Sequence, residues 1–166
     1  MQTFLPYADF TQSAKVLDYK RLGKQRVEAL QILNAIRGQS KGWRNHPCSI
    51  MWKNHEQALI KYAIVICEEW ISRGYKDSLL PRFQSQLISA NPEMPLWLGF
   101  EKLHLSHQSN LMRKDSSFYN FQVPDNLLYV WFNEDGSYYE GPKGSAAPKL
   151  ASRETAESGL PEGVRG

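Results

Sequence analysis

The amino-acid sequence predicts an all-α fold: a compact single domain dominated by three helices, followed by an extended or hairpin aromatic segment and a flexible tail. The chain has 166 residues, a length that suits one domain with its own hydrophobic core. Apolar residues recur at helical spacing over most of residues 11–114. From Gly141 onward Gly, Pro, Ser and Ala dominate without periodicity. We therefore expect the domain over residues 1–140 and the tail over residues 141–166.

Residues that start and stop helices set the bounds of the predicted helices. Thr11 or Ser13 is a suitable cap for the first helix, and Gly38 ends it. Pro47 suits the first turn of the second helix, which Gly74 ends. The expected helices cover residues 11–37, 47–74 and 98–114, with a short helix near 82–90.

Residues 127–140 change from helical spacing to an aromatic segment of a different kind. Six apolar residues at 127–132 precede a polar stretch that contains Asp135-Gly136, and two tyrosines follow it. An Asp-Gly pair between such segments is typical of a hairpin turn. The sequence therefore predicts either a small hairpin or an extended aromatic segment that packs over the helices.

The positive charge of the chain is concentrated in one segment. The whole chain carries a formal net charge of +3. Residues 15–44 alone hold eight Lys and Arg against two carboxylates, so the rest of the chain is net acidic. A segment this basic attracts polyanions whatever the net charge of the chain. A solvated, lysine-rich helix face is the alternative interpretation.

Several classes of protein are not supported by the sequence. The chain has no Walker loop, Rossmann glycine pattern, zinc-finger spacing or HExxH motif. A metal site of His46, Cys48 and His55 lacks a fourth ligand at suitable spacing, so we expect no metal and no cofactor. The N-terminus does not resemble a signal peptide, and no apolar run approaches the ~18 residues of a membrane span. We expect a cytoplasmic protein without membrane contact.

The basic segment contains a helix face on which one carboxylate lies among cations. Arg21, Lys24, Gln25 and Glu28 share this face because they are three or four residues apart. A carboxylate in such surroundings keeps its charge and is able to stabilise a cationic intermediate. An Arg–Glu surface pair of little energetic value is the alternative.

A second candidate motif lies directly before the second helix. Arg44, Asn45 and His46 would surround a helix N-terminus, where free N–H groups favour a phosphate. Trp43 beside them is suited to stacking on a base. The alternative is a capping loop, with Asn45 near the cap and Trp43 in the core.

A third candidate motif lies on the last helix. His107, Asn110, Arg113 and Lys114 line one face, and serine hydroxyls lie between them. Such donors and charges suit the phosphate oxygens of a nucleic-acid backbone. A face of internally satisfied polar groups is the alternative.

Four motifs together resemble the pyrimidine dimer DNA glycosylase family, and the resemblance covers roughly residues 1–132. In order, they are Leu17-Asp-Tyr-Lys-Arg-Leu-Gly-Lys-Gln-Arg-Val-Glu28, Trp43-Arg-Asn-His-Pro47, Trp70-Ile-Ser-Arg-Gly-Tyr75 and Ser106-His-Gln-Ser-Asn-Leu-Met-Arg-Lys-Asp115, followed by an aromatic segment that ends at Tyr129-Val-Trp131. The resemblance is close to the bacterial branch and distant to the phage-type endonuclease V. It implies a compact all-α enzyme without metal that acts on ultraviolet-damaged duplex DNA.

The resemblance also implies a mechanism. In the phage-type enzyme the N-terminal α-amine attacks the sugar C1′ of the lesion and forms a Schiff base, and a helix-borne glutamate stabilises the cation and assists elimination. An α-amine has a pKa of roughly 7.7–8.0, so a useful neutral fraction exists at pH 7. Gln2 is too large for removal of the initiator methionine to be expected, and Arg21 aligns with the family's glutamate. We therefore predict that the Met1 amine is the nucleophile and that Glu28 is the carboxylate that stabilises the cationic intermediate.

These predictions define a DNA repair enzyme: a DNA glycosylase, with an associated AP-lyase step, that acts as a monomer on double-stranded DNA and associates with the nucleoid when bound. Two alternatives stay open. One is a non-catalytic binder of damaged or bent DNA, and the other is an interaction domain whose basic helix meets an acidic protein. The residues predicted to contact DNA are Arg21, Lys24, Arg26, Arg44, Asn45, His46, His107, Asn110, Arg113 and Lys114.

Overall fold

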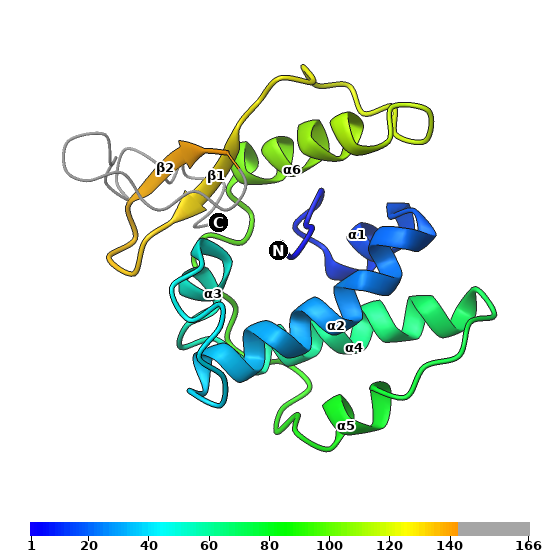
Figure 1. The fold of residues 1–166 in the computed structure, drawn as a ribbon, viewed down its shortest axis with the longest axis vertical. Coiled ribbons are helices and arrows are strands. Elements are labelled where there is room, and N and C mark those ends of the chain that lie inside the picture. Colours follow the sequence, from blue (N-terminus) through cyan, green and yellow to red (C-terminus); the bar gives the residue numbers. More distant parts are fainter. Residues whose placement is uncertain (143–166) are drawn as a thin grey trace.

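Helices make up most of the fold, and one small hairpin follows them (Figure 1). The computed structural model describes residues 1–142. Within this range the helices are α1 (Phe10–Val16), α2 (Tyr19–Ile36), α3 (Pro47–Trp52), α4 (Glu56–Ser72), α5 (Leu80–Gln84) and α6 (Glu101–Lys114), and the strands are β1 (Tyr129–Phe132) and β2 (Tyr138–Gly141). The predicted helical class and the hairpin are confirmed. Gly141 belongs to β2, and the predicted tail from residue 143 onward lies outside the described residues.

The prediction of one continuous first helix is wrong, because the helix is interrupted at Leu17 and Asp18. Leu17 is extended, with ψ 138°. Asp18 caps α2 by accepting a hydrogen bond from the Arg21 N–H through its carboxylate. Asp9, rather than Thr11 or Ser13, caps α1 in the same way. Aspartate competes well for such caps, so a single residue divides the apolar pattern into two helices.

The predicted second helix is also two helices, and the break lies at residues 53–55. Asn54 adopts the left-handed conformation with φ 68°, which asparagine tolerates better than most residues. Pro47 is the first residue of α3, as predicted. The chain leaves α4 just before Gly74, which has φ 92°. The start and stop signals were therefore right, and the interruption between them was not recognised.

Gly23 allows α2 and α4 to approach each other closely. A Cβ atom at this position would lie 2.8 Å from the Trp70 ring of α4. That ring is itself fixed, because it stacks on Tyr75 at 4.2 Å and lies 4.6 Å from the Arg26 guanidinium. Gly23 thus lowers local helix propensity but allows the packing of two helices.

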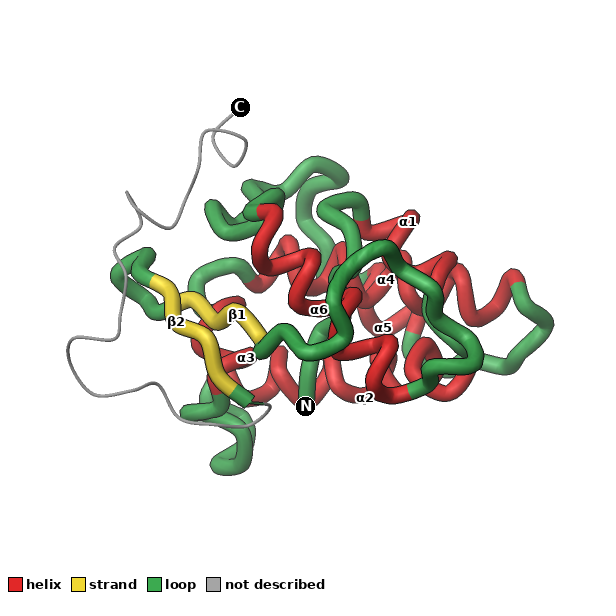
Figure 2. Tube along the Cα trace, turned by 90° about the horizontal axis from the view of Figure 1, so that it is seen from above, coloured by secondary structure: helices red, strands yellow, loops and turns green. Residues whose placement is uncertain are grey.

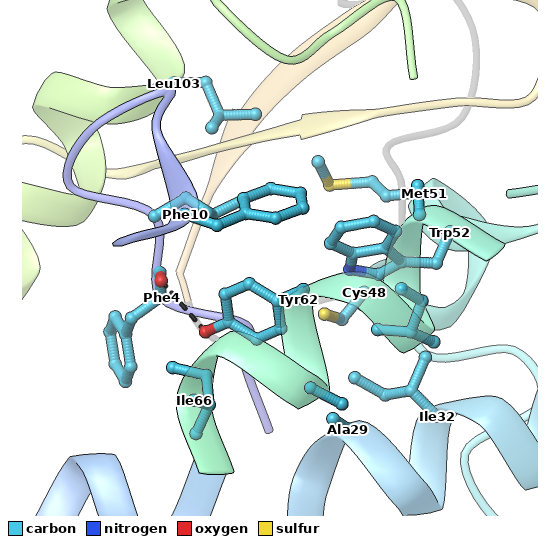
Figure 3. Packing of buried hydrophobic residues seen from close by; sticks show 14 of the residues in the cluster. Phe4, Phe10, Ala29, Ile32, Cys48, Met51, Trp52, Tyr62, Ile66 and Leu103 are labelled. Carbon is cyan, nitrogen blue, oxygen red and sulfur yellow. Dashed lines mark hydrogen bonds between the residues drawn. The ribbon is translucent and has the colours of Figure 1, made fainter. Parts of the chain in front are cut away.

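Aromatic rings form the centre of the core (Figure 3). Phe10 packs edge-on against Tyr62 at 5.4 Å between ring centroids, and Trp52 lies 6.0 Å from Tyr62. Trp97 packs edge-on against Trp52 at 4.9 Å. These rings come from α1, α3, α4 and the segment before α6, so one cluster joins most of the fold.

The hairpin closes one side of the helical ring, next to α3 and α6 (Figures 1 and 2). Its strands are antiparallel, with Tyr129 opposite Gly141 and Phe132 opposite Tyr138. Gly136 provides the left-handed residue of the turn, with φ 85°. All four side chains of β1 are buried, so this strand belongs to the core.

Candidate active site at the N-terminal segment

Residues 2–5 are extended and buried, and they run through the middle of the molecule. In Figure 1 the N-terminus lies between α6 and α2, and in Figure 2 it lies at the edge of the molecule on the α2 side. Within residues 1–142 no strand pairs with this segment. Its four backbone N–H groups instead donate to side-chain acceptors at 2.8–3.0 Å, which are Glu28, Gln2, Gln25 and His107. The polar side chains around the segment therefore replace a sheet.

Glu28 lies where this segment meets the basic face of α2. Its Oε2 atom accepts the Gln2 N–H at 2.8 Å, and its Oε1 atom lies 3.6 Å from the Lys24 Nζ. The Glu28 side chain is buried, whereas that of Lys24 is 68% exposed. The carboxylate is thus placed between the start of the chain and a cation on the surface.

Gln25 is the residue that fixes the segment to α2. Its Nε2 group donates to the Gln2 carbonyl at 2.8 Å, and its Oε1 accepts the Phe4 N–H at 2.9 Å. The Tyr62 hydroxyl donates to the same Oε1 at 2.7 Å and lies 3.0 Å from the Phe4 carbonyl (Figure 3). Burial raises the pKa of Tyr62 well above its ordinary value, so the hydroxyl remains a donor. Sequence reasoning placed Gln25 on the Glu28 face without giving it a role.

Two histidines of α6 hold the other side of the segment. The Leu5 N–H donates to His107 Nδ1 at 2.8 Å. His104 Nε2 accepts the Gly99 N–H at 2.9 Å, so its Nδ1 carries the proton donated to the Leu5 carbonyl at 2.8 Å. Burial lowers the pKa of His107 to about 3 and also lowers that of His104. Both rings are therefore neutral near pH 7.

Helix α3 contacts a third side of the segment through the Thr3 hydroxyl. The Thr3 hydroxyl accepts the Trp52 indole N–H at 2.9 Å and lies 3.4 Å from Cys48 Sγ. Burial raises the pKa of the Cys48 thiol to about 11. A thiol of this kind is protonated near pH 7 and is a poor nucleophile.

Buried polar atoms without partners follow one another along the hairpin side of this segment. Within residues 1–142 the Gln2 Nε2, His107 Nε2, Tyr129 hydroxyl and Trp131 Nε1 atoms have no hydrogen-bond partner. Three of these groups belong to rings that form a row in space. The ring centroids of His107 and Tyr129 are 5.6 Å apart, and those of Tyr129 and Trp131 are 5.3 Å apart. Because His107 Nδ1 is an acceptor, its Nε2 is a donor. All four groups are thus able to donate a hydrogen bond to an acceptor.

The structure brings several of the predicted site residues together around this segment. Met1 is half-buried and precedes the Gln2 amide that Glu28 holds. Arg21 lies 3.2 Å from Asp18 and donates to the Lys114 carbonyl. The Lys114 Nζ lies 6.0 Å from the centre of the Phe4 ring. Arg21, Lys24 and Lys114 therefore provide positive charge beside Met1 and Glu28.

Arg26 and Arg113 do not belong to that group, because each holds another part of the protein in place. The Arg26 guanidinium contacts the buried Asp77 carboxylate at 2.5 Å. Arg113 donates to Asn110, to Ser109 and to the carbonyls of residues 125 and 127, and so fixes the loop after α6. We therefore leave Arg26 and Arg113 out of the proposed interface.

His107 and Asn110 are directed inward. His107 is 2% exposed and holds Leu5, as described above. Asn110 is buried, and its Nδ2 group donates to the carbonyls of Ser106 and residue 127. Asn110 fits the alternative of an internally satisfied polar face, whereas the Nε2 of His107 has no partner within residues 1–142. Neither side chain enters the proposed interface.

The segment before α3 presents its polar groups differently from the prediction. Arg44 and Asn45 are exposed, but the half-buried His46 is itself the cap of α3 and its Nδ1 accepts the Cys48 N–H at 3.1 Å. That N–H is therefore not offered to a phosphate. Trp43 is 47% exposed, so it does not lie in the core as the capping-loop interpretation expected.

The described part of the chain offers neither a metal-binding cluster nor a membrane-spanning helix. No group of three His, Cys, Asp or Glu side chains within residues 1–142 is arranged to hold a metal ion. None of the helices in this range has both the length and the apolar character required to span a bilayer.

Comparisons with known proteins identify one family. Residues 1–80 match the family model of the pyrimidine dimer DNA glycosylases. The match supports the family assignment made from the sequence, and its range contains Met1, Glu28 and the Trp43 segment. The resemblance identified for residues 81–132 lies outside this range and stays a prediction. No curated protein and no solved structure gave a significant match.

Proposed function

From this family match, we propose that the protein is a DNA repair glycosylase that acts on damaged pyrimidines, such as pyrimidine dimers, in duplex DNA. One observation supports the proposed chemistry most directly. The Glu28 carboxylate accepts the Gln2 N–H at 2.8 Å, so the start of the chain is held beside a helix-borne acid. Covalent geometry keeps the Met1 α-amine within roughly 3–4 Å of the Gln2 nitrogen.

The proposed reaction uses this amine as a nucleophile. The neutral amine attacks C1′ of the damaged nucleotide, the glycosidic bond breaks, and the base leaves with a proton. Opening of the sugar then gives a protonated imine, whose positive charge Glu28 stabilises. Removal of a C2′ proton expels the 3′ phosphate and cuts the strand. This last step is the AP-lyase part of the proposal.

The DNA contacts in this proposal come from the cations beside the segment. Arg21, Lys24 and Lys114 flank Met1 and Glu28, and they are suited to phosphates on either side of a lesion. Arg44 and Asn45 extend the basic surface towards α3. We propose that a monomer binds double-stranded DNA through this surface and acts at the nucleoid.

Borohydride trapping on ultraviolet-irradiated duplex DNA tests this function. The protein is expressed without an N-terminal tag, and its intact mass shows whether Met1 is present. We expect a covalent protein–DNA adduct whose attachment maps to residue 1, and no adduct after the amine is acetylated. An adduct formed by the acetylated protein would assign the nucleophile elsewhere. Binding to irradiated DNA without trapping or cleavage would favour the non-catalytic binder.

A further inference from the structure

Trp43 is an exposed indole held in a strained conformation. It is the most exposed of the five tryptophans in the chain. It has φ 66°, and within residues 1–142 the only other non-glycine residue with a positive φ is Asn54. A bulky residue pays a steric cost in this region that asparagine largely avoids. Gly42 directly precedes Trp43. The glycine would adopt a positive φ without this steric cost, but the tryptophan occupies the position that requires it.

The indole is supported from behind. The His46 ring lies 5.4 Å from it, edge to face, and the buried Trp131 ring lies 6.0 Å from His46. The His46 backbone N–H donates to the Trp43 carbonyl at 3.1 Å. The turn is therefore fixed before any ligand arrives, while much of the indole surface faces solvent.

The surroundings of Trp43 favour an anionic partner. Arg44 and Lys41 are exposed, and within residues 1–142 neither forms an ion pair with a carboxylate. Arg44 and Asn45 line a recess of about 270 Å³ that also contains Ser49 and the ion pair of Lys53 with Glu134, whose charges offset each other at 2.9 Å. The Ser49 hydroxyl is buried and has no hydrogen-bond partner among the described residues. A phosphate oxygen is an acceptor that suits these groups.

The same turn leads directly to the N-terminal segment. Cys48, two residues after His46, lies 3.4 Å from the Thr3 hydroxyl. The turn that holds Trp43 and the N-terminal segment are thus connected through α3, which begins at Pro47.

We propose that Trp43 stacks on a nucleobase of distorted DNA and that Arg44 holds the adjoining phosphate, so that this turn discriminates damaged from intact duplex. The proposal rests on the proposed function. Removing a base from the duplex requires an unstacked step, and an aromatic side chain is able to fill such a step. Every base has a π-face, so this contact recognises distortion and not sequence.

Fluorescence titration with two duplexes tests the proposal. One duplex carries a single tetrahydrofuran abasic-site analogue, which offers no base to remove, and the other is the intact duplex of the same sequence. Trp52, Trp97 and Trp131 are buried, and the half-buried Trp70 is stacked on Tyr75 at 4.2 Å, so we expect a stacking change to be reported mainly by Trp43. We expect stronger quenching by the analogue duplex, and we expect W43F to lose that difference. Equal quenching of the wild type and W43F overturns the proposal.

Binding constants of a glycine variant separate recognition from folding. Trp43→Gly removes the positive-φ strain, so we expect an unfolding temperature no lower than that of the wild type. We also expect its preference for the analogue duplex to fall by roughly five- to 100-fold, the size of a base-stacking contact. Phe118→Ala, which removes an exposed aromatic ring on another loop, is the matched control and keeps the preference. Arg44→Ala weakens binding to both duplexes.

The outcomes distinguish the two proposals. If Trp43→Gly keeps the wild-type preference while the wild-type protein is trapped on irradiated DNA, the role of Trp43 is refuted and the proposed function stands. If the wild-type protein binds neither duplex and is not trapped, both proposals fail.

Discussion

Helices α2 and α6 carry similar polar patterns and use them in opposite ways. On α2, Lys24 stays in solvent while Glu28 reaches the start of the chain. On α6, His104, His107 and Asn110 are buried and their hydrogen bonds hold backbone groups in place. The two helices lie on opposite sides of residues 2–5. One therefore presents charge to solvent, and the other builds the frame against which the segment rests.

This difference shows that a polar helix face has no fixed meaning by itself. Its role depends on whether the neighbouring chain leaves backbone groups unpaired. Residues 2–5 have no partner strand, so the polar side chains nearest to them become hydrogen-bond acceptors and donors for the backbone. The following predictions test whether α2 carries the chemistry and α6 the framework.

The largest expected effect is the loss of cleavage rate in the variant Glu28→Gln. A glutamine side chain is still able to accept the Gln2 N–H, but it has no charge to stabilise a cationic intermediate. We expect the cleavage rate on irradiated plasmid DNA to fall by about 10²- to 10⁴-fold with little change in unfolding temperature. Glu101→Gln, an exposed acid at the start of α6, is the matched control and leaves the rate unchanged. A rate loss below threefold for Glu28→Gln would remove this residue from the proposed mechanism.

On α6 we expect the main effect to be on stability. His107→Ala removes a buried ring and leaves the Leu5 N–H without its acceptor, at a cost of about 3 kcal/mol in the free energy of unfolding. Urea denaturation measures this loss. Lys24→Ala on α2 should change the same quantity by less than about 0.5 kcal/mol, because its side chain is largely exposed. Similar losses for the two variants would contradict the division of roles.

The stability of the framework should depend on pH. Burial lowers the pKa of His107 from 6.5 to about 3, and the pKa of His104 is lowered as well. Between pH 6.5 and 3 the unfolded chain binds more protons at His107 than the folded chain does, and His104 acts in the same direction, so stability falls as the pH decreases. Each ring contributes at most about 1.4 kcal/mol per pH unit. Thermal denaturation between pH 7.5 and 4.5 measures the slope, which His107→Gln should reduce. An unchanged slope in that variant would show that His107 does not titrate in this way.

The smallest expected effect is on the salt dependence of DNA binding. Lys24→Ala should weaken binding a few-fold on any sequence and reduce the salt slope by about 1, because one phosphate contact is lost. Arg113→Ala should leave the slope unchanged, because the guanidinium is bonded to the loop after α6. Fluorescence anisotropy at several salt concentrations gives both slopes. A change in slope for Arg113→Ala alone would move the interface to α6.

The sequence predicted most elements and one half of the site. Local signals were sufficient for Pro47 at the start of α3, for Gly74 after α4 and for the turn at Gly136, because these residues act through their own backbone. The basic face with Glu28 was also predicted. The breaks at Asp18 and Asn54 were missed because each depends on one residue inside a long apolar pattern.

The other half of the site depends on contacts that are distant in sequence. Gln25 received no role because nothing local shows that it will bind both the Gln2 carbonyl and the Phe4 N–H. His107 was assigned to DNA because its partner, Leu5, is 102 residues away. In both cases the decisive partner is the extended N-terminal segment, whose position no periodicity indicates.

The burial of residues 2–5 has a consequence for how the protein is made. The acceptor for the Leu5 N–H is supplied by His107, 102 positions later in the chain, so the hydrogen bonds of residues 2–5 are complete only after α6 has been synthesised. Closing such a long loop is a late and costly event in folding. Residues 2–5 must therefore stay free of other partners until α6 has been synthesised.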